Sequence, residues 1–317
     1  MTVPAASPTS AGNLREPWTG MRRGLFRALR PLGGVHSSGR MSIGLFIIAF
    51  FVAVAIFGPL FAHNPNALVG PALAPPSAKF LLGTTQLGQN VFSQLVISTR
   101  ATLEVGFGAG LLAVVIALAI GTTGGFVGGR LDDVLNLLTN VVLVIPALPL
   151  IIVVSAYLKS SGLTSTVLVI AFTSWAGAAR VLRGMALSIR NRDYVRAARV
   201  SGERTWRIVS VEILPNLLPW VVSGFVYSVI FAVLTQAGLA FIGLENPNIL
   251  TWGNMLYFAQ NAQALPSGAW WWFVPPGLCI ALLGTGLALV NFGLDEILNP
   301  RLRVYKRPRS ATVGDAS

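Results

Sequence analysis

Long apolar runs separated by short polar segments dominate the chain. Six windows contain no Asp, Glu, Lys or Arg, and they lie at residues 43–61, 105–127, 135–157, 163–179, 217–241 and 271–292. An α-helix needs about 20 such residues to cross the hydrocarbon core of a bilayer. The runs lack the alternation of period two that membrane β-strands show. The pattern therefore predicts six transmembrane helices.

The composition supports a polytopic membrane protein. Apolar residues make up 54% of the chain and charged residues only 11%, whereas a soluble domain carries about 25% charged residues. The mean hydropathy is +0.69. These values exclude intrinsic disorder, a collagen and a disulfide scaffold, and the one cysteine, Cys279, cannot form an internal disulfide. We expect an all-α fold with much of its apolar surface facing lipid.

The positions of the basic residues indicate the orientation in the membrane. If the N-terminus is cytoplasmic, 20 Lys and Arg fall in inside segments, and only three, Lys79, Arg100 and Lys159, fall outside. Lys and Arg are enriched in cytoplasmic loops, so both termini are expected in the cytoplasm. This asymmetry also accounts for the net charge of +12 without any nucleic acid partner.

Residues that membrane enzymes require are missing from the expected places. The only lysines, Lys79, Lys159 and Lys306, do not end a phosphate-binding glycine loop. The two histidines, His36 and His63, lie outside the six windows, and no aspartate lies within one. We therefore predict no catalytic residue, no metal site and no cofactor in this chain.

The polar segment between the fourth and fifth windows, residues 180–215, carries the main functional signal. Its sequence predicts two short helices that meet at Gly202, where a residue without a Cβ can turn the chain. Ala197 and Ala198 would let another surface approach closely, and the surrounding arginines could pair with acidic residues on it. The alternative is an ordinary basic inside loop whose alanines merely favour helix.

This segment resembles a motif in the membrane subunits of bacterial ABC importers. The motif usually reads Glu-Ala-Ala-x-x-x-Gly and, further on, ends in Ile-x-Leu-Pro; here RAARVSG is followed by ILP. The residues that match in register are Ala197, Ala198, Gly202, Leu214 and Pro215. Arg196 stands in place of the usual glutamate, and Glu212 stands in place of the usual isoleucine.

Three further motifs resemble the second permease subunit of dipeptide, oligopeptide and nickel importers. They are FLLGTTQLGQNVFSQLVISTRATLEVG at residues 80–106, FIGLENPNILTWGNML at 241–256 and LNPRLR at 298–303. The similarity covers roughly residues 40–303. Neutral residues replace charges that are usual in that group, which indicates a less charged translocation path; they are Thr85, Gln89, Asn90, Leu137 and Asn140.

The resemblance implies a type I ABC importer permease fold with six transmembrane helices and a cytoplasmic coupling-helix loop between the fourth and fifth. It also implies a sister permease, two cytoplasmic ABC ATPases and an extracytoplasmic solute-binding protein as partners, in the bacterial inner membrane. The ATPase-docking residues are then Tyr194, Arg196, Ala197, Ala198, Gly202, Leu214 and Pro215.

The expected organisation has four parts. Residues 1–40 form a disordered basic cytoplasmic tail, and residues 41–100 form the first transmembrane helix with an outside loop. Residues 101–303 form the permease transmembrane domain, and residues 304–317 form a second cytoplasmic tail.

Polar residues inside the windows are candidates for the translocation path, because each costs free energy in lipid. They are Asn136, Thr139 and Asn140 in the third window and Tyr227, Thr235 and Gln236 in the fifth. Hydrogen bonding between helices is the alternative for these six and the favoured one. Pro146 and Pro149 are expected to kink the third helix.

Two other functions compete with the permease. A secondary transporter or channel without ATPases would need acidic residues at the membrane midplane or inverted repeats, and neither is visible. A membrane scaffold without transport activity is disfavoured by the spacing of Gly202 and Pro215. Peptides are the leading substrate hypothesis, and nickel and glutathione remain open.

Overall fold

The computed structural model describes residues 39–157 and 162–298. Within them every regular element is a helix, apart from two isolated β-bridges in the segment that precedes residue 91. The predicted tails, residues 1–40 and 304–317, lie outside the described residues except for Gly39 and Arg40. Lys159 and most of the LNPRLR motif also lie outside them.

Long helices account for most of the predicted membrane windows. In chain order the helices are α2 (Gly39–Phe61), α3 (Val91–Val127), α4 (Gly129–Val144), α5 (Ala147–Tyr157), α6 (Leu163–Arg190), α7 (Asp193–Val200), α8 (Thr205–Ile208), the π-helical turn η2 (Val209–Ile213), α9 (Leu214–Phe241), α10 (Trp252–Asn261) and α11 (Trp270–Leu298). Among the described residues, five continuous helical stretches are long and apolar enough to cross a membrane, and α4 with α5 makes a sixth if counted as one broken span.

The third window differs from the predicted kinked helix, because α4 and α5 are separate and bent by 86°. The break lies at Ile145, whose φ of −74° and ψ of 125° are extended. A residue before proline is disfavoured in the α region, and Pro146 supplies no backbone N–H to continue the helix. Pro149 is accommodated near the start of α5, where a missing N–H costs little.

Two other boundaries also move. The fourth window was expected to end at residue 179, but α6 continues to Arg190 and includes Arg180 and Arg183. Helix α3 begins at Val91, so the expected boundary after residue 100 falls inside a helix, and Arg100 is part of that helix rather than of an outside loop. Arg100 pairs with Glu104 at 2.8 Å on the surface of α3.

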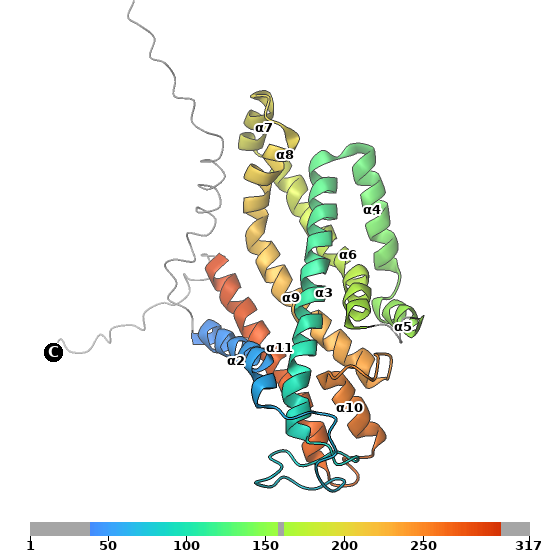
Figure 1. Ribbon diagram of the computed structural model, residues 1–317. Coiled ribbons are helices and arrows are strands. Elements are labelled where there is room, and N and C mark those ends of the chain that lie inside the picture. Colours follow the sequence, from blue (N-terminus) through green and yellow to red (C-terminus); the bar gives the residue numbers. More distant parts are fainter. Residues whose placement is uncertain (1–38, 158–161, 299–317) are drawn as a thin grey trace, which may run out of the picture.

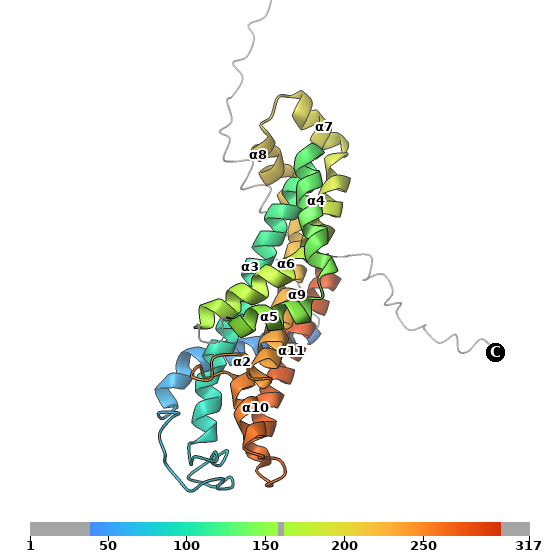
Figure 2. The same ribbon diagram turned by 90° about the vertical axis from the view of Figure 1, so that its right-hand side faces the viewer.

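The molecule is elongated, with α7 and α8 at one end and α10 at the other (Figures 1 and 2). The turn between α3 and α4 lies at the α7 end, and the loop between α2 and α3 lies at the α10 end. Helix α3 joins the two ends. Its 37 residues span about 55 Å at 1.5 Å per residue, which exceeds the thickness of the hydrocarbon core.

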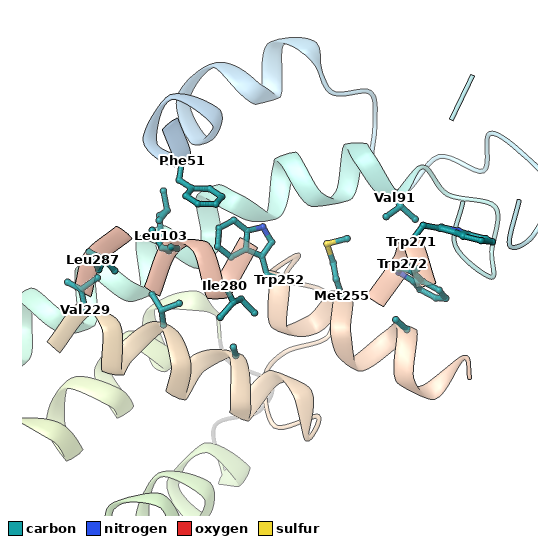
Figure 3. Close-up of a cluster of buried hydrophobic side chains, with 14 of the residues drawn as sticks. Phe51, Val91, Leu103, Val229, Trp252, Met255, Trp271, Trp272, Ile280 and Leu287 are labelled. Atoms are coloured by element: carbon teal, nitrogen blue, oxygen red, sulfur yellow. The ribbon is translucent and has the colours of Figure 1, made fainter. Parts of the chain in front are cut away.

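An apolar core near the α10 end joins α2, α3, α9, α10 and α11 (Figure 3). Trp252, at the start of α10, is fully buried, and its ring meets Phe51 of α2 edge-on at 5.2 Å between centroids. Its indole N–H donates to the carbonyl of Leu95, and its backbone N–H donates to Thr102 Oγ1. This one residue therefore fixes α10 against both α2 and α3.

The backbones of α3 and α6 approach each other closely near the α7 end. A Cβ on Gly121 would lie 2.5 Å from the carbonyl oxygen of Ala179, and one on Gly125 would lie 2.6 Å from that of Arg183. Small residues at helix interfaces permit such contacts in membranes. These two glycines set the distance between the helices.

Polar contacts of Arg183 with Asp132 and of Arg180 with Asn140 connect α6 to α4. Arg183 donates from Nε and Nη2 to the two carboxylate oxygens of Asp132, at 2.6 and 2.8 Å. One helical turn before it, Arg180 donates to Asn140 Oδ1 at 2.7 Å. The planar guanidinium fits a carboxylate in two parallel hydrogen bonds, so α4 is held in a defined register.

The Asp132–Arg183 pair predicts a coupled loss of stability. Asp132→Ala or Arg183→Ala alone leaves a partly buried charge without its partner, so each should lower the free energy of unfolding by about 2 kcal/mol. The double variant should lose clearly less than the sum. Thermal melts of the four proteins in one detergent would measure this, and additive losses would contradict the pairing.

Candidate functional site

The segment between α6 and α9 folds into a compact helical turn at the α7 end (Figures 1 and 2). Helix α7 ends in hydrogen bonds from Ser201 N to Ala197 O and from Glu203 N to Ala198 O, at 2.9 and 3.1 Å. Gly202 lies between these donors with a φ of +77°. Glycine adopts this left-handed conformation without the steric cost that a Cβ adds, so the local structure explains its use at the turn.

The inner face of this segment is anchored to the helix bundle. Val195 of α7 and Ile213 are fully buried, and Ile208 is nearly so. They belong to one apolar cluster with Phe126 of α3 and with residues of α6. The guanidinium of Arg199 also lies over the ring of Phe126 at 4.8 Å. Helix α7 is therefore packed in one cluster with residues of α3, α6 and α9.

The outer face of the same segment is open. Val200 is 90% exposed and Trp206 is 61% exposed. A Cβ on Gly202 would meet no atom within 4 Å. Arg196 and Ala197 are exposed beside them. An apolar and basic surface without neighbours in its own chain suits a partner protein.

The seven predicted docking residues divide between this surface and its base. Tyr194, Arg196, Ala197, Ala198 and Gly202 lie on α7 or directly after it, and only Ala198 among them is half-buried. Leu214 and Pro215 begin α9 and are half-buried. Asn216 joins the two groups, since its amide donates to the Tyr194 hydroxyl at 3.5 Å.

Sequence reasoning did not identify Val200 and Trp206 as residues of this exposed surface. Val200 stands five residues after the buried Val195, and at 3.6 residues per turn this places it away from the buried face. That spacing was the available signal. Trp206 precedes the buried Ile208 on a helix of four residues, too short for periodicity to define a face.

A groove of about 590 Å³ lies between α4, α5, α6, α9 and α11. Its uncharged polar lining consists of Thr173, Ser174, Ser223, Tyr227, Ser228 and Asn291. Trp220 and Phe231 add aromatic surface, and the break at Ile145 and Pro146 forms part of the wall. Among the described residues that line the groove, no side chain is charged.

The six predicted path residues are not gathered in one place. Tyr227 lines the groove and is 65% exposed. Asn140 bonds to Arg180, Thr139 bonds to the Leu135 carbonyl of its own helix, and Gln236 bonds to Glu245. Thr235 is buried and Asn136 is half-buried. Sequence reasoning missed the three serines and the one threonine of the lining, because short hydroxyl side chains in apolar helices give the same signal when they only bond their own backbone.

Comparison with known proteins identifies the family. Residues 113–304 match the family described as binding-protein-dependent transport system inner membrane component. The chain is 31% identical to the dipeptide transport system permease protein DppC of Bacillus subtilis, over 82% of this chain and 81% of that protein. It is 31% identical to the oligopeptide transport system permease protein OppC of the same organism, over 82% and 85%.

A third relative is the probable D,D-dipeptide transport system permease protein DdpC of Escherichia coli, which is 32% identical over 80% of this chain and 85% of that protein. The resemblance found in the sequence motifs is thereby confirmed. The five or six candidate spans agree with a multi-pass subunit of the inner membrane. The chain belongs to the family of binding-protein-dependent transport system inner membrane components, the permease subunits of ABC importers.

Proposed function

We propose that this chain forms half of a translocation pathway for peptides and that a sister permease forms the other half. Two cytoplasmic ABC ATPases drive the cycle, and an extracytoplasmic binding protein delivers the solute. The observation that carries the proposal is that one face of the α7–α8 segment is buried against the helix bundle while the opposite face is exposed. This segment is joined through η2 to α9, one of the helices that line the groove.

The geometry supports a direct mechanical route from the docking surface to the groove. Movement of an ATPase against α7 would be transmitted by the buried Val195 and Ile208. The chain then continues through η2 into α9, which contributes Trp220 and Tyr227 to the groove. Tilting of α9 relative to α4 and α5 would open the groove to one side of the membrane at a time.

The groove chemistry supports a peptide. Hydroxyl and amide side chains can donate to and accept from peptide bonds, and the apolar wall suits side chains of varied shape. A metal ion such as nickel would favour imidazole, carboxylate or thiolate ligands. None of these groups is among the described lining residues of this half of the path.

The same proposal assigns the two ends of the molecule to the two sides of the membrane. The α7 end carries Arg130 and the arginines from Arg190 to Arg207, so it would face the cytoplasm together with both termini. The α10 end would face the binding protein. The fold is then a type I importer permease in which α4 and α5 form the third of six spans.

The orientation predicts opposite labelling of two single cysteines. In a Cys279→Ala background, Asn248→Cys at the α10 end should react with a membrane-impermeant thiol reagent added to intact cells. Ser201→Cys at the α7 end should be protected, and both positions are exposed in the structure. After permeabilisation both should react, which controls for accessibility. The reverse pattern in intact cells would contradict the orientation.

Substitutions of Gly202 are expected to leave folding intact and to weaken the binding of the ATPases. Gly202→Asp and Gly202→Asn add side chains of similar size at a positive φ, where the strain costs about 1 kcal/mol and Asn is among the better tolerated residues. Nothing within 4 Å in the chain would clash with either Cβ. Both variants should therefore insert and pair with the sister permease, while ATPase binding falls, by more for Asp than for Asn.

The measurement for Gly202 is copurification of the ATPases and solute-stimulated ATP hydrolysis in proteoliposomes. Gly184→Asp is the matched control, because Gly184 is also exposed and has open space around it but lies on α6 away from the turn. If Gly202→Asp couples as well as the parent protein, the docking assignment is wrong.

If the groove is part of the pathway, a large side chain on its α9 wall should block transport. Ser228→Trp would fill part of the 590 Å³ space, so peptide uptake should fall about tenfold or more. Ser228→Ala, which only removes a hydroxyl, should retain most uptake. Uptake of a labelled dipeptide into proteoliposomes would compare the two, with ATPase copurification showing that assembly is intact. Equal uptake by both variants would exclude the groove from the pathway.

A further inference from the structure

A carboxyl group is buried where α9 ends. Glu245 follows α9 by a few residues and is only 4% exposed. Its Oε2 accepts hydrogen bonds from Gln236 Nε2 at 2.7 Å and from Thr251 Oγ1 at 2.8 Å. The contacts join the last turns of α9 to the residue that caps α10.

Two oxygen atoms of this cluster have no hydrogen-bond partner, and both are fully buried. They are Glu245 Oε1 and Gln236 Oε1. Both atoms are acceptors while the carboxyl group is ionised, and a buried polar atom without a hydrogen-bond partner lowers the stability of the folded state. One added proton removes the problem, because a protonated carboxyl oxygen becomes a donor.

The two planar groups already share one hydrogen bond, from the amide nitrogen to Oε2. Their remaining oxygens are the two atoms that a paired acid and amide would join through the acid proton. Burial supports the protonated form, since it raises the pKa of Glu245 from 4.5 to about 7, while the hydrogen bonds from Thr251 and Gln236 oppose that rise.

Among the residues that the structure describes, the side chains that line the space beside Glu245 from neighbouring elements are uncharged. A small cavity beside it is lined by Ser155 of α5, Ser165 and Thr166 of α6, and Asn246. No charged side chain other than Glu245 lines that cavity within the described part of the chain. Lys159, in the connection between α5 and α6, lies outside that part, so the test below includes it.

A proton fits this site better than a metal ion. Hard cations such as Ca²⁺ take about six to eight oxygen ligands, whereas the unpartnered oxygens here number two. The cavity leaves only about 10 Å³ for the centre of a water-sized guest, which is about the minimum for one water molecule.

We propose that Glu245 and Gln236 form a proton-binding site in which neutral Glu245 donates from Oε1 to Gln236 Oε1. The proton comes from solvent and returns to it when Glu245 ionises. In the protonated state the end of α9 is tied through Glu245 and Thr251 to the start of α10. In the ionised state Thr251 still donates to Glu245 Oε2, but Glu245 Oε1 and Gln236 Oε1 are two buried acceptors without a shared donor, so the contact between these two side chains becomes unfavourable. The site does not depend on the proposed transport function.

Infrared spectroscopy of the assembled complex tests the proton directly. The carbonyl band of a buried protonated carboxyl group should be present at about pH 5 and lost by about pH 8 or 9, with a midpoint near 7. Glu245→Gln should remove this band, and the control Glu104→Gln, at an exposed carboxyl group, should leave it. A spectrum in which the parent and Glu245→Gln show the same titration would overturn the proposal.

Two further variants distinguish this site from an ion pair. Thr251→Val removes a donor that favours the ionised form, so the midpoint of the band should move to higher pH. Lys159→Ala should leave the band unchanged. If the band appears only after Lys159→Ala, Glu245 is ionised and paired in the parent protein, and the proposal is wrong.

Thermal stability of the parent protein and of Glu245→Gln gives a second readout. The folded state holds this proton up to about pH 7, whereas the unfolded chain releases it near 4.5. This contribution to stability is therefore complete below 4.5 and lost as pH rises through about 7. The melting temperature of the parent minus that of Glu245→Gln should fall across this window. A difference that stays constant with pH would contradict the site.

Discussion

The close contact between the backbones of α3 and α6 is the constraint on which the other arrangements rest. Gly121 and Gly125 leave no room for a side chain between the two helices. Helix α6 therefore lies where Arg183 can bind Asp132. Because α7 follows α6 directly in the chain, its residues pack against Phe126 of α3. Because interhelical attraction in lipid depends on packing and polar contacts rather than on the hydrophobic effect, a close glycine contact followed by a charged clamp is an effective combination.

The α7–α8 segment is packed firmly against the helix bundle on one face and is exposed on the other. Its buried side chains join three helices, while its outward side chains, above all Val200 and Trp206, touch little of their own chain. A flexible loop with the same exposed residues could bind a partner, but it would absorb the displacement locally. Under the proposed function, the anchored form would instead convert a displacement at the membrane surface into a tilt of whole helices.

The sequence was sufficient for those features that lipid itself imposes. An apolar segment in hydrocarbon must satisfy its backbone internally, so uncharged windows locate helices well, and five of the six correspond to continuous helical stretches. The fourth window ended too early because a charged residue was taken to end an apolar helix. In the structure the helix continues, since Arg180 and Arg183 form hydrogen bonds with Asn140 and Asp132. Those partners are distant in sequence, and no local pattern identifies them.

The site was predicted less completely for a related reason. The turn at Gly202 is encoded locally, since a single glycine permits the left-handed conformation. The groove depends on how five helices meet, so its serines and its threonine cannot be told apart from ordinary helix residues before the helices are placed. The separation of Asn140 and Gln236 from Tyr227 has the same origin, because helix rotation decides which polar side chain faces a neighbour and which faces the groove.

Under the proposed function, the break between α4 and α5 would change what the groove can offer to a solute. Where a helix stops, the carbonyl groups of its last turn no longer receive the N–H donors that a continuing helix would supply. The last turn of α4 ends at Val144, and Val142, Leu143 and Ile145 line the groove. Main-chain oxygens are the same whatever side chains surround them. A pathway that offers such acceptors would recognise the repeating amide groups of a solute without selecting among its side chains.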